Sequence, residues 1–227
     1  MKSTIIFVIA LSMILFTGCA TNEQTTTAYQ NTSVNSSNQN KENKIASKPV
    51  KTEKDVQLEL PQSGDSIAVI ETDLGVIKFK LFTKDILELT KNFIYLANKG
   101  QYKDVPFHRV VKDFMIQTGD FTNKNGTGGY SYKGPGTNLP NEINPNYKHL
   151  FGTVSMAKTV APVSIGSQFF IVTNKKGTPL LDGNYSPIGQ VYEGMDVALA
   201  IANLQVPGTE KPSKVVNMKK VTIQKIP

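Results

Sequence analysis

The sequence predicts a mainly β fold, a closed β-barrel whose ends are covered by two α-helices. Short runs rich in β-branched and aromatic residues recur along the chain, and turn residues separate them. Only two segments have the apolar spacing of a helix, and they lie far apart in the sequence. Many strands, two well-separated helices and frequent turns together favour a barrel over the other layered architectures.

The first residues are typical of a secretory signal that covers residues 1–18. Lys2 gives a positive start, and the apolar run 5–16 is too short to cross a bilayer comfortably. Cys19 is the only cysteine and follows directly after small residues. This layout resembles a bacterial lipoprotein signal, which implies that Cys19 is lipidated, although Phe16 stands where leucine is usual. The alternative is an ordinary signal peptide with an incidental cysteine.

Residues 19–64 are predicted to be a disordered tether between the lipid on Cys19 and a domain at 65–227. Thr, Asn, Ser and Gln dominate its first half, and hydrophobic residues are nearly absent, so ordering it would bury too little apolar surface. We therefore expect a domain anchored to the cell membrane through lipid and facing outside the cytoplasm. With Cys19 committed to lipid, no disulfide is available to the chain.

The charge of the chain favours an anionic membrane or wall surface over nucleic acid. The sequence has 25 basic and 18 acidic residues, a net charge of +7, which falls to +6 when Lys2 leaves with the signal. The positive charges are lysines without an arginine cluster, so no nucleic-acid partner is expected.

The domain is expected to open with a β-hairpin. Residues 67–72 and 76–82 are β-rich runs, and the turn between them contains Gly75. In the second run Ile77, Phe79 and Leu81 share one side of the strand, and the other side carries Val76, Lys78 and Lys80. This alternation predicts a half-buried strand.

A helix is predicted over residues 85–99, with Thr83 as its N-cap and Gly100 as its stop. Strands are expected at 107–111 and 115–117, then a glycine-rich surface loop at 123–136 that shapes the edge of a pocket. The remaining predicted elements are strands at 152–157, 167–172, 183–192 and 215–224, and a second helix at 195–204.

Arg109 is the residue of the stretch 106–121 that most needs a function. It is the only arginine among 25 basic residues, so this position requires the planar, weakly hydrated donor fork that lysine lacks. One interpretation is a site that grips a neutral ligand rich in carbonyl groups. The other is a structural arginine tied to a backbone carbonyl, to Asp113 or to Asp120. These residues alone do not separate the two.

Most catalytic chemistry is unsupported by the composition. His108 and His149 are the only histidines, no cysteine is available to pair with them, and no serine stands in a nucleophile-elbow motif. The spacing of metal ligands is also absent, so no metal or other cofactor is expected. His108 is expected to be buried and hydrogen-bonded. A reaction that needs no nucleophile remains, or simple binding.

Five sequence blocks, in order, resemble the cyclophilin family over residues 66–225. They are Phe107-His108-Arg109 with 114–121, the glycines of 125–129, Ser155-Met156-Ala157, Gly166 to Ile171, and Leu181-Asp182-Gly183. The resemblance implies an eight-stranded antiparallel barrel capped by two helices. It also implies peptidyl-prolyl cis-trans isomerase activity on proline-containing exported polypeptides, by a monomer that assists their folding. A non-catalytic chaperone or adhesion module that binds proline peptides is the alternative.

The resemblance also assigns the site. Arg109 matches the catalytic arginine of the family, and Ala157 the wall along which the substrate backbone lies. Two positions depart from the family: Leu180 stands where tryptophan is frequent, which puts tight binding of cyclosporin-like macrocycles in doubt, and Tyr185 replaces a histidine at the pocket rim. The other matches are the apolar proline pocket, Phe114, Met115, Phe170 and Leu181, and the flanking amides, Gln117 and Gln168.

Overall fold

The computed structural model describes residues 53–227, so the predicted signal, Cys19 and most of the predicted tether lie outside the described residues. The described part holds three α-helices and a short 3-10 helix at Pro179–Leu181. The α-helices are α1 (Glu53–Leu58), α2 (Leu87–Asn98) and α3 (Met195–Ala202). The strands are β1 (Ser66–Thr72), β2 (Gly75–Leu81), β3 (Val105–Pro106), β4 (Arg109–Val111), β5 (Met115–Thr118), β6 (Leu139–Pro140), β7 (Thr153–Met156), β8 (Val163–Ile165), β9 (Phe169–Val172), β10 (Ser186–Glu193) and β11 (Asn217–Lys225).

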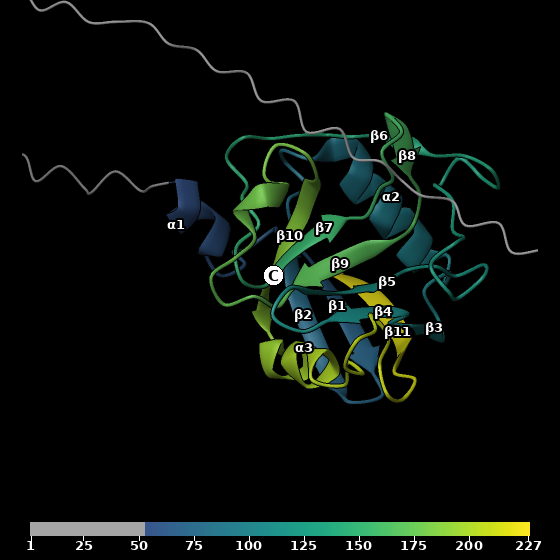
Figure 1. Cartoon of the computed structure of the whole chain (residues 1–227). Helices are drawn as coiled ribbons and strands as arrows, with labels where there is room; N and C mark the ends of the chain where they lie inside the picture. The colour runs from purple at the N-terminus through teal and green to yellow at the C-terminus, as the bar shows by residue number, and fades with distance from the viewer. Residues whose placement is uncertain (1–52) are drawn as a thin grey trace, which may run out of the picture. The chain divides into compact units, whose positions relative to one another are not determined.

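A curled antiparallel sheet of nine strands forms the frame, in the order β3-β11-β1-β2-β10-β7-β9-β5-β4 (Figure 1). Strands β6 and β8 pair separately. The mainly β prediction is confirmed, but the closed eight-stranded barrel is not: the hydrogen-bonded sheet has two edges, β3 and β4. Only Phe107 and His108 separate these edge strands along the chain. The curl therefore brings the start and the end of the sheet into the same region.

The predicted hairpin is confirmed by β1 and β2, which pair with Ile70 opposite Ile77. Ile77 and Phe79 are fully buried, as the alternation of β2 requires, and they face the main core. At the far side of that core the ring of Phe93 from α2 packs against Phe79 and Phe169 at centroid distances of 5.4 and 5.3 Å. The aromatic contacts thus join the hairpin, a helix and a distant strand into one core.

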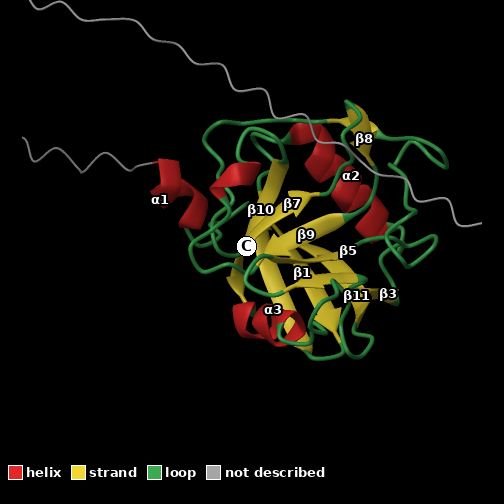
Figure 2. Cartoon of the chain, viewed as in Figure 1, coloured by secondary structure: helices red, strands yellow, loops and turns green. Residues whose placement is uncertain are grey.

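The two predicted helices are confirmed as α2 and α3, which lie at opposite ends of the sheet (Figure 2). Gly100 ends α2 with a φ of +70°, the left-handed conformation that favours glycine. The prediction of Thr83 as N-cap is wrong, because the N-cap position is Ile86, which offers no acceptor. Instead the carboxylate of Glu142 accepts the backbone N–H groups of Leu87, Glu88 and Leu89 at 2.7, 3.0 and 3.0 Å.

The ordered domain begins earlier than residue 65, because α1 falls within the predicted tether. Gln57 of α1 is fully buried. Its amide donates to the Lys148 carbonyl at 2.8 Å and to Gln190 at 3.0 Å, and it accepts the Lys148 N–H at 2.9 Å. A single buried amide therefore ties α1 to the domain, although its segment reads as polar linker. Within residues 53–227, no helix combines the length and the apolarity needed to cross a bilayer.

Candidate active site

The strand register places the site on the outer face of the sheet. Arg109 of β4 is opposite Gln117 of β5, and Gln117 is opposite Phe170 of β9. Residues directly opposite each other on antiparallel strands point to the same side. Their chain neighbours Val110 and Ile116 point the other way, into the main core. Three strands thus line up a guanidinium, an amide and an aromatic ring in one row.

A second, smaller hydrophobic cluster surrounds this row. Met115, Phe170 and Val172 are buried in it, although they lie outside the main core. Next to them is a cavity of about 90 Å³. Eight of the residues assigned by resemblance line this cavity: Arg109, Phe114, Met115, Gln117, Ala157, Phe170, Leu181 and Tyr185. Lys158, which the sequence did not single out, lines it too, and its ammonium lies 5.0 Å from the centre of the Tyr185 ring.

Leu180 does not line the cavity, unlike the other apolar residues assigned to the site. It belongs to the 3-10 turn Pro179–Leu181 and is 92% exposed, whereas its neighbour Leu181 packs on the small cluster. Successive side chains of such a turn diverge, so only one of the two can face the cavity. A leucine at this position contributes no donor and no wall in the structure.

The Arg109 guanidinium is held by a carboxylate and an amide. Its Nε donates to Glu210 at 2.7 Å and its Nη2 to the same carboxylate at 3.1 Å. Its Nη1 donates to Gln117 Oε1 at 3.2 Å. Neither Asp113 nor Asp120, the partners considered from the sequence, takes part. The hydrogen bond from Arg109 holds the pKa of the Glu210 carboxyl below its usual range.

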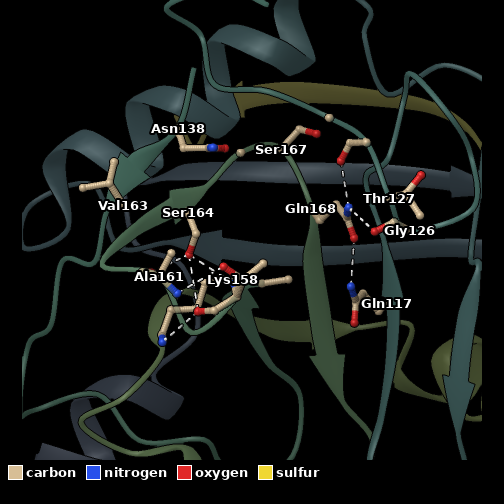
Figure 3. Close-up of a pocket in the computed structure, with 15 residues that line it drawn as sticks. Gln117, Gly126, Thr127, Asn138, Lys158, Ala161, Val163, Ser164, Ser167 and Gln168 are labelled. Atoms are coloured by element: carbon tan, nitrogen blue, oxygen red, sulfur yellow. Dashed lines mark hydrogen bonds between the residues drawn. The ribbon is translucent and has the colours of Figure 1, made fainter. Parts of the chain in front are cut away.

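A directed chain of hydrogen bonds continues from Arg109 across the site. A guanidinium only donates, so the oxygen of Gln117 faces it and the Gln117 N–H₂ faces Gln168 Oε1, at 2.9 Å. The Gln168 N–H₂ in turn donates to the carbonyls of Gly126 and Gly128 at 2.9 and 2.8 Å (Figure 3). The amide orientations are therefore fixed from one end by Arg109. Gln168 is placed in the site but lines the neighbouring cavity instead of the small one.

That neighbouring cavity has a volume of about 400 Å³. Figure 3 shows the residues that line it. Gln117, Ala157 and Lys158 line both cavities and so form the wall between them. Its other walls include residues 126–129 and Ser164, which confirms that the glycine-rich loop shapes a pocket edge.

Asp120 holds the glycine-rich loop in place. Its carboxylate accepts the backbone N–H groups of Asn123, Gly126 and Gly128 at 2.9, 2.9 and 3.0 Å, and those of two further loop residues at 3.2 Å. Burial raises the pKa of this carboxyl, but the backbone donors outweigh burial and lower the pKa to about 2. The loop is therefore built around a permanent negative charge.

A serine, a histidine and an aspartate do meet behind the small cavity. His149 Nδ1 lies 2.8 Å from the Asp182 carboxylate and His149 Nε2 lies 3.0 Å from Ser155 Oγ. The carboxylate can only accept, so Nδ1 carries the proton and Nε2 accepts from the serine. Ser155 and His149 are buried, and Ser155 lines neither cavity, so no substrate reaches the hydroxyl. The His149 ring stacks at 6.0 Å from Phe170, so the three residues brace the cavity.

Ser155→Ala tests this interpretation. The substitution removes the donor to a buried imidazole nitrogen, so we expect a loss of about 1–2 kcal/mol in the free energy of unfolding. We expect isomerisation of proline peptides to stay within about twofold of wild type, because Ser155 does not touch the cavity. Urea unfolding and a peptide assay measure the two quantities. Ester hydrolysis by wild type that Ser155→Ala abolishes would mark a nucleophile instead.

His108 is buried as expected; neither ring nitrogen has a partner in full hydrogen-bond geometry. Burial lowers the pKa of His108, and the neighbouring Asp120 and the Gln168 side chain oppose this shift. Within residues 53–227, no cluster of three or more His, Cys, Asp or Glu side chains is arranged to hold a metal ion.

The fold and the site define a mainly β protein with an arginine beside an apolar cavity, on the face of a curled sheet that points away from the main core. Residues 67–223 match the family model of the cyclophilin type peptidyl-prolyl cis-trans isomerases. The chain is 36% identical over 153 residues to the peptidyl-prolyl cis-trans isomerase CYP18-2 of Arabidopsis thaliana, a match that covers 67% of this chain and 90% of the relative. It is 37% identical over 155 residues to the peptidyl-prolyl cis-trans isomerase-like 1 of Neurospora crassa, covering 68% and 91%.

Solved structures agree with the sequence relatives. A crystal structure of a cyclophilin type peptidyl-prolyl cis-trans isomerase from Cryptosporidium parvum superposes with a TM-score of 0.66 at 33% identity. The match covers 72% of this chain and 99% of that structure. The chain therefore belongs to the cyclophilin type peptidyl-prolyl cis-trans isomerase family, and the enzyme class is that of a peptidyl-prolyl isomerase.

Proposed function

We propose that this protein is a lipid-anchored prolyl isomerase that binds proline-containing segments of exported polypeptides and assists their folding outside the cytoplasm. The observation that carries the proposal is an isomerase-family domain with Arg109 at an apolar cavity, in a chain whose first residues read as a lipoprotein-type signal followed by Cys19. The net positive charge of the chain supports attraction to an anionic membrane surface.

The proposed mechanism needs no proton transfer. Partial double-bond character gives the X–Pro bond a barrier of about 20 kcal/mol, and uncatalysed rotation takes tens of seconds or longer. As the bond twists, this resonance is lost and the prolyl nitrogen gains a basic lone pair. An N–H of Arg109 aimed at that nitrogen stabilises the twisted state more than either planar state, which is the requirement for catalysis.

The remaining lining residues are proposed to bind and orient the peptide. The proline ring is placed in the apolar cavity formed by Phe114, Met115, Phe170 and Leu181, which excludes water and strengthens the arginine donor. The related C. parvum isomerase was also crystallised in the presence of the dipeptide Ala-Pro, and its structure superposes with a TM-score of 0.65. That relationship supports an X–Pro peptide as the class of ligand.

A non-catalytic module that binds proline peptides is the second candidate function. The same apolar cavity supports binding. A binding module, however, has no need for an arginine held in place by both Glu210 and Gln117. Isomerisation measured on the full chain in detergent micelles separates the two candidates. We expect acceleration well above the uncatalysed rate, and a rate equal to the uncatalysed one would leave only the binding module.

Cys19→Ala tests the anchor and should separate the anchor from the enzyme. Cells grown with labelled fatty acid are expected to incorporate label into the wild-type protein and to retain it in the membrane fraction. We expect the substitution to abolish labelling and leave peptide isomerisation unchanged, because Cys19 precedes the domain. Equal labelling of both proteins would refute the lipid anchor. Refolding of a secreted proline-limited reporter, slower in cells with Cys19→Ala, is the expected consequence for exported clients.

A further inference from the structure

We propose that Glu210 is a positioning residue for the isomerase reaction, fixing the Arg109 guanidinium so that its unused donors are presented to the twisting bond. The inference rests on the proposed catalytic role of Arg109. Glu210 lies 101 residues after Arg109 in the chain and does not line either cavity. It touches the arginine and not the substrate site, so its effect on the reaction is indirect.

The loop that carries Glu210 is built onto the edge of the sheet. Strand β4 is an edge strand, and its outer N–H groups need acceptors. The Glu210 carbonyl accepts the Val110 N–H at 2.8 Å, and Gln205 Oε1 accepts the Lys112 N–H at 2.6 Å. The loop is also braced within itself, since the Val206 N–H donates to the Lys211 carbonyl at 2.9 Å. The backbone of Glu210 is therefore fixed beside the backbone of the residue following Arg109.

A count of donors shows what this arrangement achieves. A guanidinium has five N–H groups. Glu210 takes the Nε donor and one Nη2 donor, and Gln117 takes one Nη1 donor. Two donors remain, one on each terminal nitrogen. The two oxygens of one carboxylate accept from Nε and Nη2 at the same time, and this fixes the plane of the guanidinium. The directions of the two remaining donors are fixed with it.

Stability alone gives little reason for the pair. The Arg109 and Glu210 side chains are 37% and 58% exposed, and ion pairs this exposed contribute little to folding. An arginine side chain loses much rotamer freedom when its head is fixed. Without Glu210 the single bond to Gln117 is the remaining anchor of the guanidinium. The pair is thus suited to orientation: removing it changes where the donors point and leaves the fold intact.

Glu210→Gln in the full chain, compared with Glu193→Gln, tests the inference. Glu193 is a matched control, because it is a similarly exposed glutamate paired with Lys78 at 2.9 Å, away from the cavities. Isomerisation of a proline peptide is followed by exchange NMR, which needs no protease. We expect Glu210→Gln to lose roughly tenfold in kcat/KM, since displacing a reacting group by about 1 Å costs up to about 100-fold. Peptide Kd and Tm are expected to stay at the wild-type values, and Glu193→Gln to match wild type throughout.

The pH dependence of kcat/KM at acid pH separates positioning from a structural role. A purely structural Glu210 would not change the shape of this profile. The pKa of Glu210 is lowered by Arg109, so the pair persists as the pH falls until that lowered pKa is reached and is then lost. Wild-type kcat/KM should fall there, and this fall should be missing in Glu210→Gln. Any fall shared by both proteins belongs to another group, for which His108 and Asp120 are the titratable neighbours. Glu210→Asp, which keeps the charge on a shorter arm, should recover part of the rate.

The outcomes separate this inference from the proposed function. Loss in both Arg109→Ala and Glu210→Gln, with unchanged Tm in the latter, supports both. Loss in Arg109→Ala with a wild-type rate in Glu210→Gln overturns only the positioning role. A wild-type rate in Arg109→Ala overturns the catalytic role of the arginine and with it this inference. A matching drop of Tm and activity in Glu210→Gln would show a structural residue and would also overturn it.

Discussion

Arg109→Ala is expected to reduce kcat/KM for X–Pro isomerisation by about 10²–10³-fold, the usual loss when one positioned donor to a transition state is removed. Peptide binding is expected to change only a few-fold, because the apolar cavity that takes the proline ring keeps its other walls. Exchange NMR on the full chain supplies both numbers, since it reports the isomerisation rate and the fraction of peptide bound.

Two further variants define what the arginine supplies. Arg109→Lys keeps the charge and loses the fork, and a lysine cannot engage Glu210 through two nitrogens while donating to Gln117 from a third. We therefore expect it to be almost as slow as Arg109→Ala. Lys112→Ala removes a charge from an exposed residue of the same edge and should retain the wild-type rate. Equal losses of binding and turnover in Arg109→Ala would mean that the arginine binds the planar ground state, and catalysis would need another donor.

Local patterns predicted those elements whose signals lie within a few residues. The β1–β2 hairpin follows from the alternation around Gly75, and the end of α2 from Gly100. Strands β7 and β9 are buried on both faces, so alternation gives no sign of which side chains face the core. Phe170 therefore reads as an ordinary core residue by pattern. Only the resemblance placed it in the site.

Contacts between segments that are distant in the chain could not be predicted from the sequence. Gln57 bonds to residues 91 and 133 positions away, and its segment has the composition of a linker. Glu142 caps α2 from 55 positions away. Only residues close to the start of the helix can be judged as caps from the sequence, and Thr83 is the candidate among them. Glu210 stands in a turn with no periodicity at all. In each case one polar side chain satisfies backbone or guanidinium donors brought to it by the fold, and no local signal marks such a residue.

Asp120→Asn should produce the largest change in stability of any substitution around the site. The asparagine keeps one acceptor oxygen but replaces the other with an N–H₂ group. This group points at backbone N–H groups that donate to the carboxylate in wild type, so two donors face each other. We expect the free energy of unfolding at pH 7 to fall by about 2–3 kcal/mol. The pKa of Asp120 gives the same order of magnitude: a decrease from 3.8 to about 2 corresponds to about 2 kcal/mol. Urea unfolding monitored by tyrosine fluorescence measures it, with Asp113→Asn as the control.

The pH dependence of that loss identifies its cause. Because folding lowers the pKa of Asp120, its stabilisation is complete above about pH 4 and is lost as the pH falls towards about 2. The difference in the free energy of unfolding between wild type and Asp120→Asn should therefore be constant from pH 7 to about 5 and shrink below about pH 4.

Asp113 has the left-handed φ of 57° that asparagine also tolerates, so the control variant Asp113→Asn should match wild type. A loss in Asp120→Asn that persists unchanged at pH 2.5 would assign the effect to packing of the loop. Since Gln168 donates to carbonyls of the same loop, we also expect weaker peptide binding wherever Asp120 is neutral.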